Sequence, residues 1–91
     1  MKLDELHTLV VAHTDSGQFV MVDGKPQQEL VLSGTIEKLR AGLFFLRIQG
    51  KKYTCIQQEG FDVGQEVECI CKFLIEDGQV KDIIVRNVLA K

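Results

Sequence analysis

Residues 42–55 read GLFFLRIQGKKYTC and join two strand-like runs through a glycine-containing corner. Neighbouring residues on a strand point to opposite faces of a sheet, so if Phe44 lies in a core, Phe45 points out of it. Gly50-Lys51 has the composition of a two-residue hairpin loop. The stretch therefore predicts two antiparallel strands with an aromatic side chain on their outer face.

A loop at Gly50-Lys51 would place Gln49 opposite Lys52 and Phe45 opposite Ile56. Alternation along each strand then sorts the side chains between two faces. The expected core face carries Phe44, Leu46, Ile48, Tyr53 and Cys55, and the expected outer face carries Phe45, Arg47, Lys52, Thr54 and Ile56.

The chain from Glu29 onward reads as short strands separated by turn residues, with no segment of helical period. Gly34 lies inside the first of these strands and predicts a bulge or a sharp bend. The same alternation places Val67, Cys69, Cys71 and Phe73 in the core. The expected strands are Leu30–Leu39, Leu43–Gln49, Lys52–Gln57, Glu66–Phe73 and Gln79–Val88.

Residues 1–28 are expected to form an extension, either a β-hairpin or a short helix, that packs on a barrel formed by residues 29–91 of the same domain. Leu3 and Leu6 fit a helical stripe, whereas the β-branched residues that follow favour a hairpin turning at Asp15-Ser16-Gly17. Asp23–Pro26 is expected to be a turn or loop, with Pro26 ending further ladder pairing.

The composition is that of a folded domain, with 91 residues of which 45% are hydrophobic and 26% charged. Asp4 and Glu5 stand where a secretory signal would carry positive charge. The three cysteines have no paired spacing, which favours a reducing, cytoplasmic location. The net charge of −2 argues against a strongly electrostatic nucleic-acid binder. However, residues 33–60 hold five basic against two acidic residues.

The segment after residue 29 resembles an oligonucleotide/oligosaccharide-binding fold, the OB-fold, which implies a five-stranded Greek-key barrel. Two features depart from the common pattern: no helix is evident between the third and fourth strands, and the net charge is acidic. The stretches that carry the resemblance are LVLSGTIEKL, GLFFLRIQGKKYTC, DVGQEVECICKF and EDGQVKDIIVRNV.

The resemblance implies a non-enzymatic module that binds nucleic acid, preferably single-stranded DNA or RNA, across its second and third strands. Phe45 would stack on a base. Arg47 and Lys52 would contact the nucleic-acid backbone, Thr54 would lie beside them on the same face, and Lys38, Arg40 and Lys51 would extend the basic rim.

A protein-interaction or assembly module is the alternative. In that interpretation Phe45 and Ile56 form a cross-strand pair covered by the amino-terminal extension or by a second copy of the chain. The apolar run Ile83–Val85 in the last strand also requires cover on both faces, which is compatible with a homodimer.

No catalytic constellation, metal site or cofactor motif is evident. Cys69 and Cys71 point the same way on one strand, with Cys55 on a neighbouring strand, and core packing accounts for all three better than metal ligation. His7 and His13 are too far apart to share an ion and are interpreted as polar surface residues.

Overall fold

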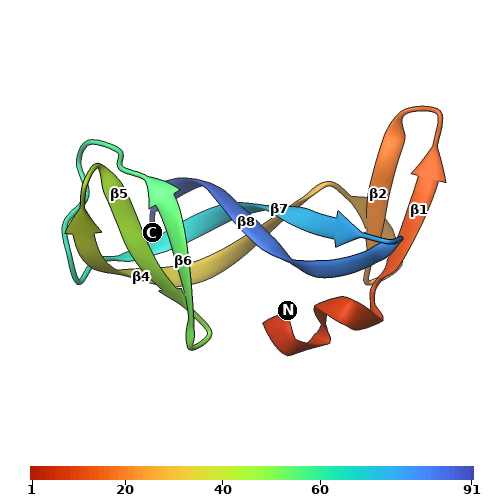
Figure 1. Cartoon of the computed structure of the whole chain (residues 1–91), viewed down its shortest axis with the longest axis horizontal. Helices are drawn as coiled ribbons and strands as arrows, with labels where there is room; N and C mark the ends of the chain where they lie inside the picture. The colour runs from red at the N-terminus through yellow and green to blue at the C-terminus, as the bar shows by residue number, and fades with distance from the viewer.

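The computed structural model describes all 91 residues, and almost all of its regular structure is antiparallel β-sheet (Figure 1). The all-β prediction is confirmed. The elements in chain order are η1 (Leu3–Thr8), β1 (Val10–Thr14), β2 (Gly17–Val22), β3 (Lys25–Gln27), β4 (Glu29–Arg40), β5 (Leu43–Ile48), β6 (Lys51–Ile56), β7 (Glu66–Glu76) and β8 (Gln79–Ala90).

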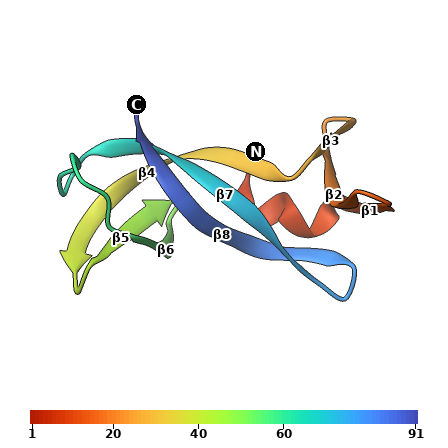
Figure 2. The same cartoon turned by 90° about the horizontal axis from the view of Figure 1, so that it is seen from above.

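The larger sheet has five strands in the order β6-β5-β4-β7-β8 and curls into a half-barrel (Figures 1 and 2). Its central strand β4 pairs with β7 over Glu29–Thr35 and with β5 over Thr35–Arg40, so Thr35 has a partner on both sides. Gly34 lies next to this change of partner, but the β-bulge is not at Gly34. It lies between Ile36 and Lys38, where the pairing of β4 with β5 shifts by one residue.

One apolar cluster of 18 buried residues fills the inner face of the half-barrel and extends to η1 and β2. Predicted core positions on both halves of the sheet belong to it: Phe44, Leu46, Ile48, Cys55, Val67, Cys69 and Cys71. Tyr53 and Phe73 are also on this side but are only partly buried. Strand alternation therefore predicted the inward face of β5, β6 and β7 correctly.

The predicted loop of the β5–β6 hairpin was wrong by one residue. The loop is Gln49-Gly50, with φ of 50° and 82°. A type I′ turn needs positive φ at both central positions, so glycine occupies the second one. Ile48 consequently pairs with Lys51, and Phe45 with Thr54 rather than with Ile56. Each residue keeps its face, because moving a two-residue loop by one position shifts every cross-strand pair by two residues, which is the period of a strand.

The amino-terminal segment forms both of the structures that the sequence left open, a 3₁₀ helix and a hairpin. β1 pairs with β2 around a turn at Asp15-Ser16, with Thr14 opposite Gly17. The expectation that Pro26 ends ladder pairing was wrong, because it lies in β3 opposite Met21. β3 is an edge strand, where a residue without an N–H is tolerated when that position faces outward.

The 3₁₀ helix η1 packs against the half-barrel through Leu3 and Leu6, which are both buried. The Gln49 side chain holds it at the β5–β6 loop. Gln49 Oε1 accepts the Leu3 N–H at 2.7 Å, and Gln49 Nε2 donates to the Met1 carbonyl at 2.6 Å. None of the helices has the length and hydrophobicity needed to cross a membrane.

Candidate functional site

Cross-strand register arranges the outer face of β4, β5 and β6 in three rows. Residues paired across an antiparallel ladder lie on the same face of the sheet, so each row is a set of lateral neighbours. The rows are Thr35, Arg47 and Lys52; then Lys38, Phe45 and Thr54; then Arg40, Leu43 and Ile56.

Phe45 occupies the middle of this face. Its ring is half-buried between Lys38 on β4 and Thr54 on β6. Ile56 lies in the next row opposite Leu43 and is 76% exposed. The face therefore presents one aromatic side chain with cations in the rows on both sides of it and an exposed aliphatic side chain in one of those rows.

Arg47 is engaged within the protein. Its Nε donates to Glu37 Oε1 at 2.8 Å, its Nη2 donates to Glu37 Oε2 at 3.3 Å, and its Nη1 donates to the Gly50 carbonyl at 2.9 Å. Glu37 is the bulge residue of β4, which projects its carboxylate towards β5. The hydrogen bond from Arg47 lowers the pKa of Glu37. Arg47 therefore orders the hairpin, and its charge is largely neutralised.

The other cations of this face, Lys38, Arg40 and Lys52, form no ion pair. Lys51 is also unpaired but lies elsewhere. It is opposite Ile48, so alternation turns it to the other face, where it lines a cavity with Lys2 and Gln49. Six of the seven residues predicted for the site thus share one face, and Lys51 does not.

The edge strands β6 and β8 face each other across a seam that has no backbone hydrogen bond. Side chains join the two edges at each end of this seam. The Tyr53 hydroxyl donates to Asp82 Oδ1 at 2.7 Å. At the other end, Gln58 Oε1 accepts the Val88 N–H at 2.8 Å, and its Nε2 donates to the Val88 carbonyl at 3.4 Å.

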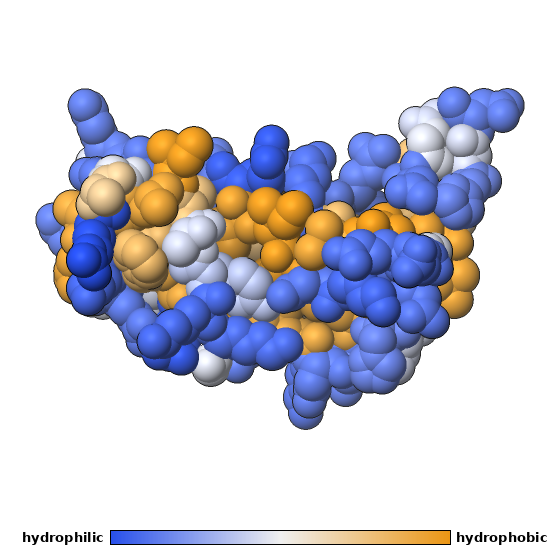
Figure 3. All heavy atoms as spheres, in the orientation of Figure 1, coloured by the Kyte–Doolittle hydropathy of each residue, from blue (hydrophilic) through white to orange (hydrophobic).

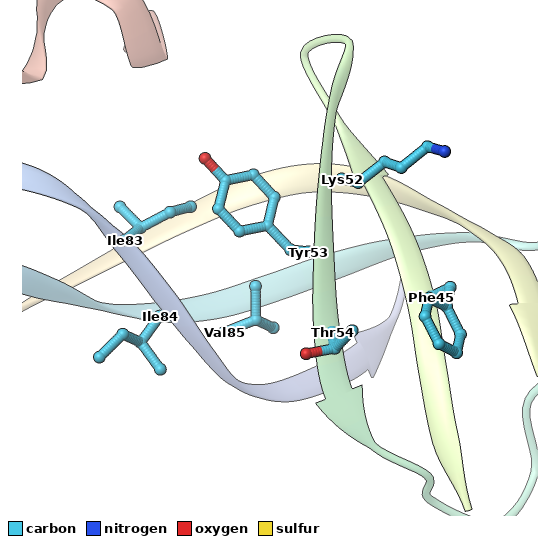
Figure 4. A pocket seen from close by; sticks show the side chains of 7 residues that line it. All are labelled: Phe45, Lys52, Tyr53, Thr54, Ile83, Ile84 and Val85. Carbon is cyan, nitrogen blue, oxygen red and sulfur yellow. The ribbon is translucent and has the colours of Figure 1, made fainter. Parts of the chain in front are cut away.

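A groove of about 420 Å³ opens along the seam (Figure 4). Tyr53 points from β6 towards Ile83 on β8, while Phe45 stands on the other side of β6. Sequence reasoning did not predict this groove, although the apolar run Ile83–Val85 was a signal that β8 needed cover. Its lining residues are Phe45, Lys52, Tyr53, Thr54, Ile83, Ile84 and Val85.

The three cysteines are buried and carry no disulfide. Burial raises the pKa of Cys69 to about 11 and of Cys71 to about 12. The reactive form of cysteine is the thiolate, so these thiols behave as small apolar side chains. No group of three His, Cys, Asp or Glu side chains is placed to hold a metal ion.

Comparison with known proteins adds no functional assignment. No protein-family model matches the chain, and no match was found among the curated proteins or the solved structures.

Proposed function

We propose that this chain is an OB-like, non-enzymatic module that binds single-stranded nucleic acid across the outer face of β4, β5 and β6. The arrangement around Phe45 carries the proposal. Lys38 is its lateral neighbour, Arg40 and Lys52 lie in the adjacent rows, and none of these cations forms an ion pair. An aromatic platform with free cations beside it is the usual arrangement for binding a single strand.

The strand order supports the proposed kinship with the OB-fold. That fold is a five-stranded, partly open Greek-key barrel whose second and third strands bind the ligand. Here β4 pairs with both β5 and β7, and the open seam lies between β6 and β8. Counted from β4, the Phe45 face belongs to the second and third strands. As the sequence indicated, no helix separates β6 from β7.

The number of free cations sets the expected strength of the electrostatic contribution. Each phosphate contact to a single strand contributes a slope of about −0.7 to log K against log salt. Contacts from Lys38, Arg40 and Lys52 on this face therefore contribute a slope of about −2, or a loss of about 20-fold in affinity between about 50 and 200 mM salt. The modest slope is consistent with the net charge of −2.

Fluorescence anisotropy with labelled single-stranded DNA and RNA oligomers tests the proposal directly. We expect saturable binding with that salt dependence. Phe45→Leu should weaken binding about 5- to 150-fold, because stacking contributes about 1–3 kcal/mol per base. Phe45→Trp keeps a stacking surface and serves as the matched control. If wild-type protein does not bind either oligomer at about 50 mM salt, the proposal fails.

The competing proposal is an assembly module that uses the same face against a protein. The exposure of Ile56, at 76%, is the observation that favours it. Light scattering on purified protein separates the two proposals. A stable dimer that Ile56→Ser dissociates, in a protein without affinity for oligomers, would assign the face to self-association.

A further inference from the structure

The groove between β6 and β8 is bordered by backbone groups that the sheet does not use. Ile48 and Lys51 flank the two-residue loop and form the first hydrogen-bonded pair of the hairpin. Such pairs alternate along the ladder, so the N–H and C=O groups of Lys52, Thr54 and Ile56 point away from β5 and into the seam. No backbone hydrogen bond reaches them from β8.

The floor and walls of the groove are mostly apolar. On the face drawn in Figure 3, hydrophobic side chains gather over the middle of the molecule, with hydrophilic side chains along its margins. A second cavity of about 320 Å³ adjoins the first and shares Thr54 and Val85 with it. Both volumes lie in the range of about 300–1,000 Å³ that is typical of sites for small organic groups.

The charged side chains that line these two cavities are both cations. Lys52 lines the first cavity and Arg86 lines the second, and neither residue is in an ion pair. The carboxylate of Asp82 lies at the end of the seam, where it accepts the Tyr53 hydroxyl and the Ile83 N–H. The groove thus complements a group with apolar faces, a hydrogen-bonding edge and negative charge on both flanks.

We propose that this groove is a subsite for one base of the bound strand, an inference that rests on the proposed function. The base next to the one stacked on Phe45 turns into the seam, and its edge bonds to the free backbone groups of β6. Lys52 and Arg86 contact the flanking phosphates. Arg86 and Ile84 are therefore additional binding residues, contributed by the last strand.

The side-chain bridges argue against an extended peptide as the occupant. A peptide added to a sheet edge forms main-chain hydrogen bonds along several residues. Here the hydrogen bonds Tyr53–Asp82 and Gln58–Val88 close both ends of the seam. The space between them is suited to a short insertion such as a single base. Phe45 lines the same groove, so a strand stacked there passes directly over its opening.

Photocrosslinking of an oligomer that contains 5-iodouracil tests where the base lies. Trypsin cleaves after Arg40, Arg47, Lys81 and Arg86, so β5 and β8 yield separate peptides, Ala41–Arg47 and Asp82–Arg86. We expect crosslinks in Asp82–Arg86 as well as in Ala41–Arg47. Crosslinks restricted to Ala41–Arg47 would overturn the subsite but leave the proposed function standing.

Two matched pairs of variants on β8 provide the affinity test. Ile84→Glu should weaken binding at least tenfold, whereas Leu89→Glu should not change it more than twofold. These side chains are 41% and 48% exposed, so neither change removes a core residue. Arg86→Ala should weaken binding and reduce the salt slope by about 0.7, with Lys81→Ala as its exposed control.

If both variants of a pair change the affinity equally, the proposed subsite is wrong. The loss of affinity in Phe45→Leu tests the proposed function independently. If the wild-type protein binds no oligomer, both proposals fail. In that case, light scattering tests whether the seam binds a second copy of the chain. A wild-type dimer that dissociates in the Ile84→Glu variant would show that it does.

Discussion

The Tyr53 hydroxyl donates to Asp82 Oδ1 at 2.7 Å and so joins the two edge strands of the half-barrel. Tyr53→Phe removes this bond, and we expect a loss of about 1.5–3 kcal/mol in the free energy of unfolding, the usual range for a bond to a charged acceptor. Urea denaturation measures the loss. Asp82→Asn keeps an acceptor oxygen and should cost less. Equal stability of Tyr53→Phe and wild type would show that the bond does not hold the seam in solution.

The buried thiols predict a loss of stability at alkaline pH. Burial raises the pKa of Cys69 from its usual 9.0 to about 11, and that of Cys71 to about 12. As the pH rises, the unfolded chain therefore loses these protons before the folded chain does. The contribution of the buried thiols to the free energy of unfolding is complete below about pH 9 and decreases as the pH rises towards 11 and 12. Urea midpoints at pH 7.5, 9 and 10.5 measure the decrease. Cys71→Val should flatten the profile, and a flat wild-type profile would contradict the prediction.

Gly34 has no space for a larger side chain. A Cβ there would lie 2.9 Å from Cys69 Sγ and 3.0 Å from Ile48 Cγ1. We expect Gly34→Ala to destabilise the fold by about 1–3 kcal/mol, the usual cost of overpacking. Val31→Ala, an exposed position on the same strand, is the control. Because Cys69→Ala removes the nearest atom, the double variant should cost less than the sum of the single changes. Strict additivity would show that this contact is not the cause.

Gln49 is expected to anchor the amino-terminal helix. Gln49→Gly removes its two hydrogen bonds to the segment and also relieves a positive φ of 50°. Hydrogen exchange at Leu3–Thr8 should therefore accelerate while the amides of β4 and β7 remain protected. Asp77→Gly relieves a similar φ of 52° at the β7–β8 turn and serves as the control. Unchanged exchange at η1 would mean that Leu3 and Leu6 hold it without the Gln49 bonds.

Lys51 and Lys52 are adjacent in the chain but lie on opposite faces of β6. Only Lys52 shares the Phe45 face, so Lys52→Ala should weaken oligonucleotide binding and reduce the salt slope by about 0.7. Lys51→Ala should have little effect on either quantity. Anisotropy titrations at several salt concentrations measure both. If the two variants lose affinity equally, the strand does not follow the Phe45 face.

The strands of the half-barrel were predictable to within three residues because their signals are local. Alternation marks the buried positions, and turn residues such as Gly50 and Gly78 mark the reversals. The register of the β5–β6 hairpin was harder to predict, because a single glycine is compatible with either position of a two-residue loop. Pro26 was misjudged because tolerance of proline depends on whether a strand is at an edge, which only the assembled sheet determines.

The candidate site, too, was predictable only where its signals are local. Local alternation placed Phe45, Arg47 and Lys52 on one face, and the position of the loop did not affect this. The ion pair between Arg47 and Glu37 depends on a bulge in a third strand, so the sequence did not reveal that this cation is engaged. The seam brings β6 beside β8 only after the whole sheet has curled, and no short stretch of sequence encodes that approach.

The double pairing of β4 has a consequence for synthesis on the ribosome. Thr35–Arg40 can find its partner as soon as β5 emerges, but Glu29–Thr35 pairs with Glu66–Lys72. This half of the strand therefore waits, with its backbone hydrated and its apolar side chains uncovered, until more than thirty further residues have been translated. The nascent chain carries an unpaired strand edge throughout that interval, and such an edge is a template for mispairing with other chains.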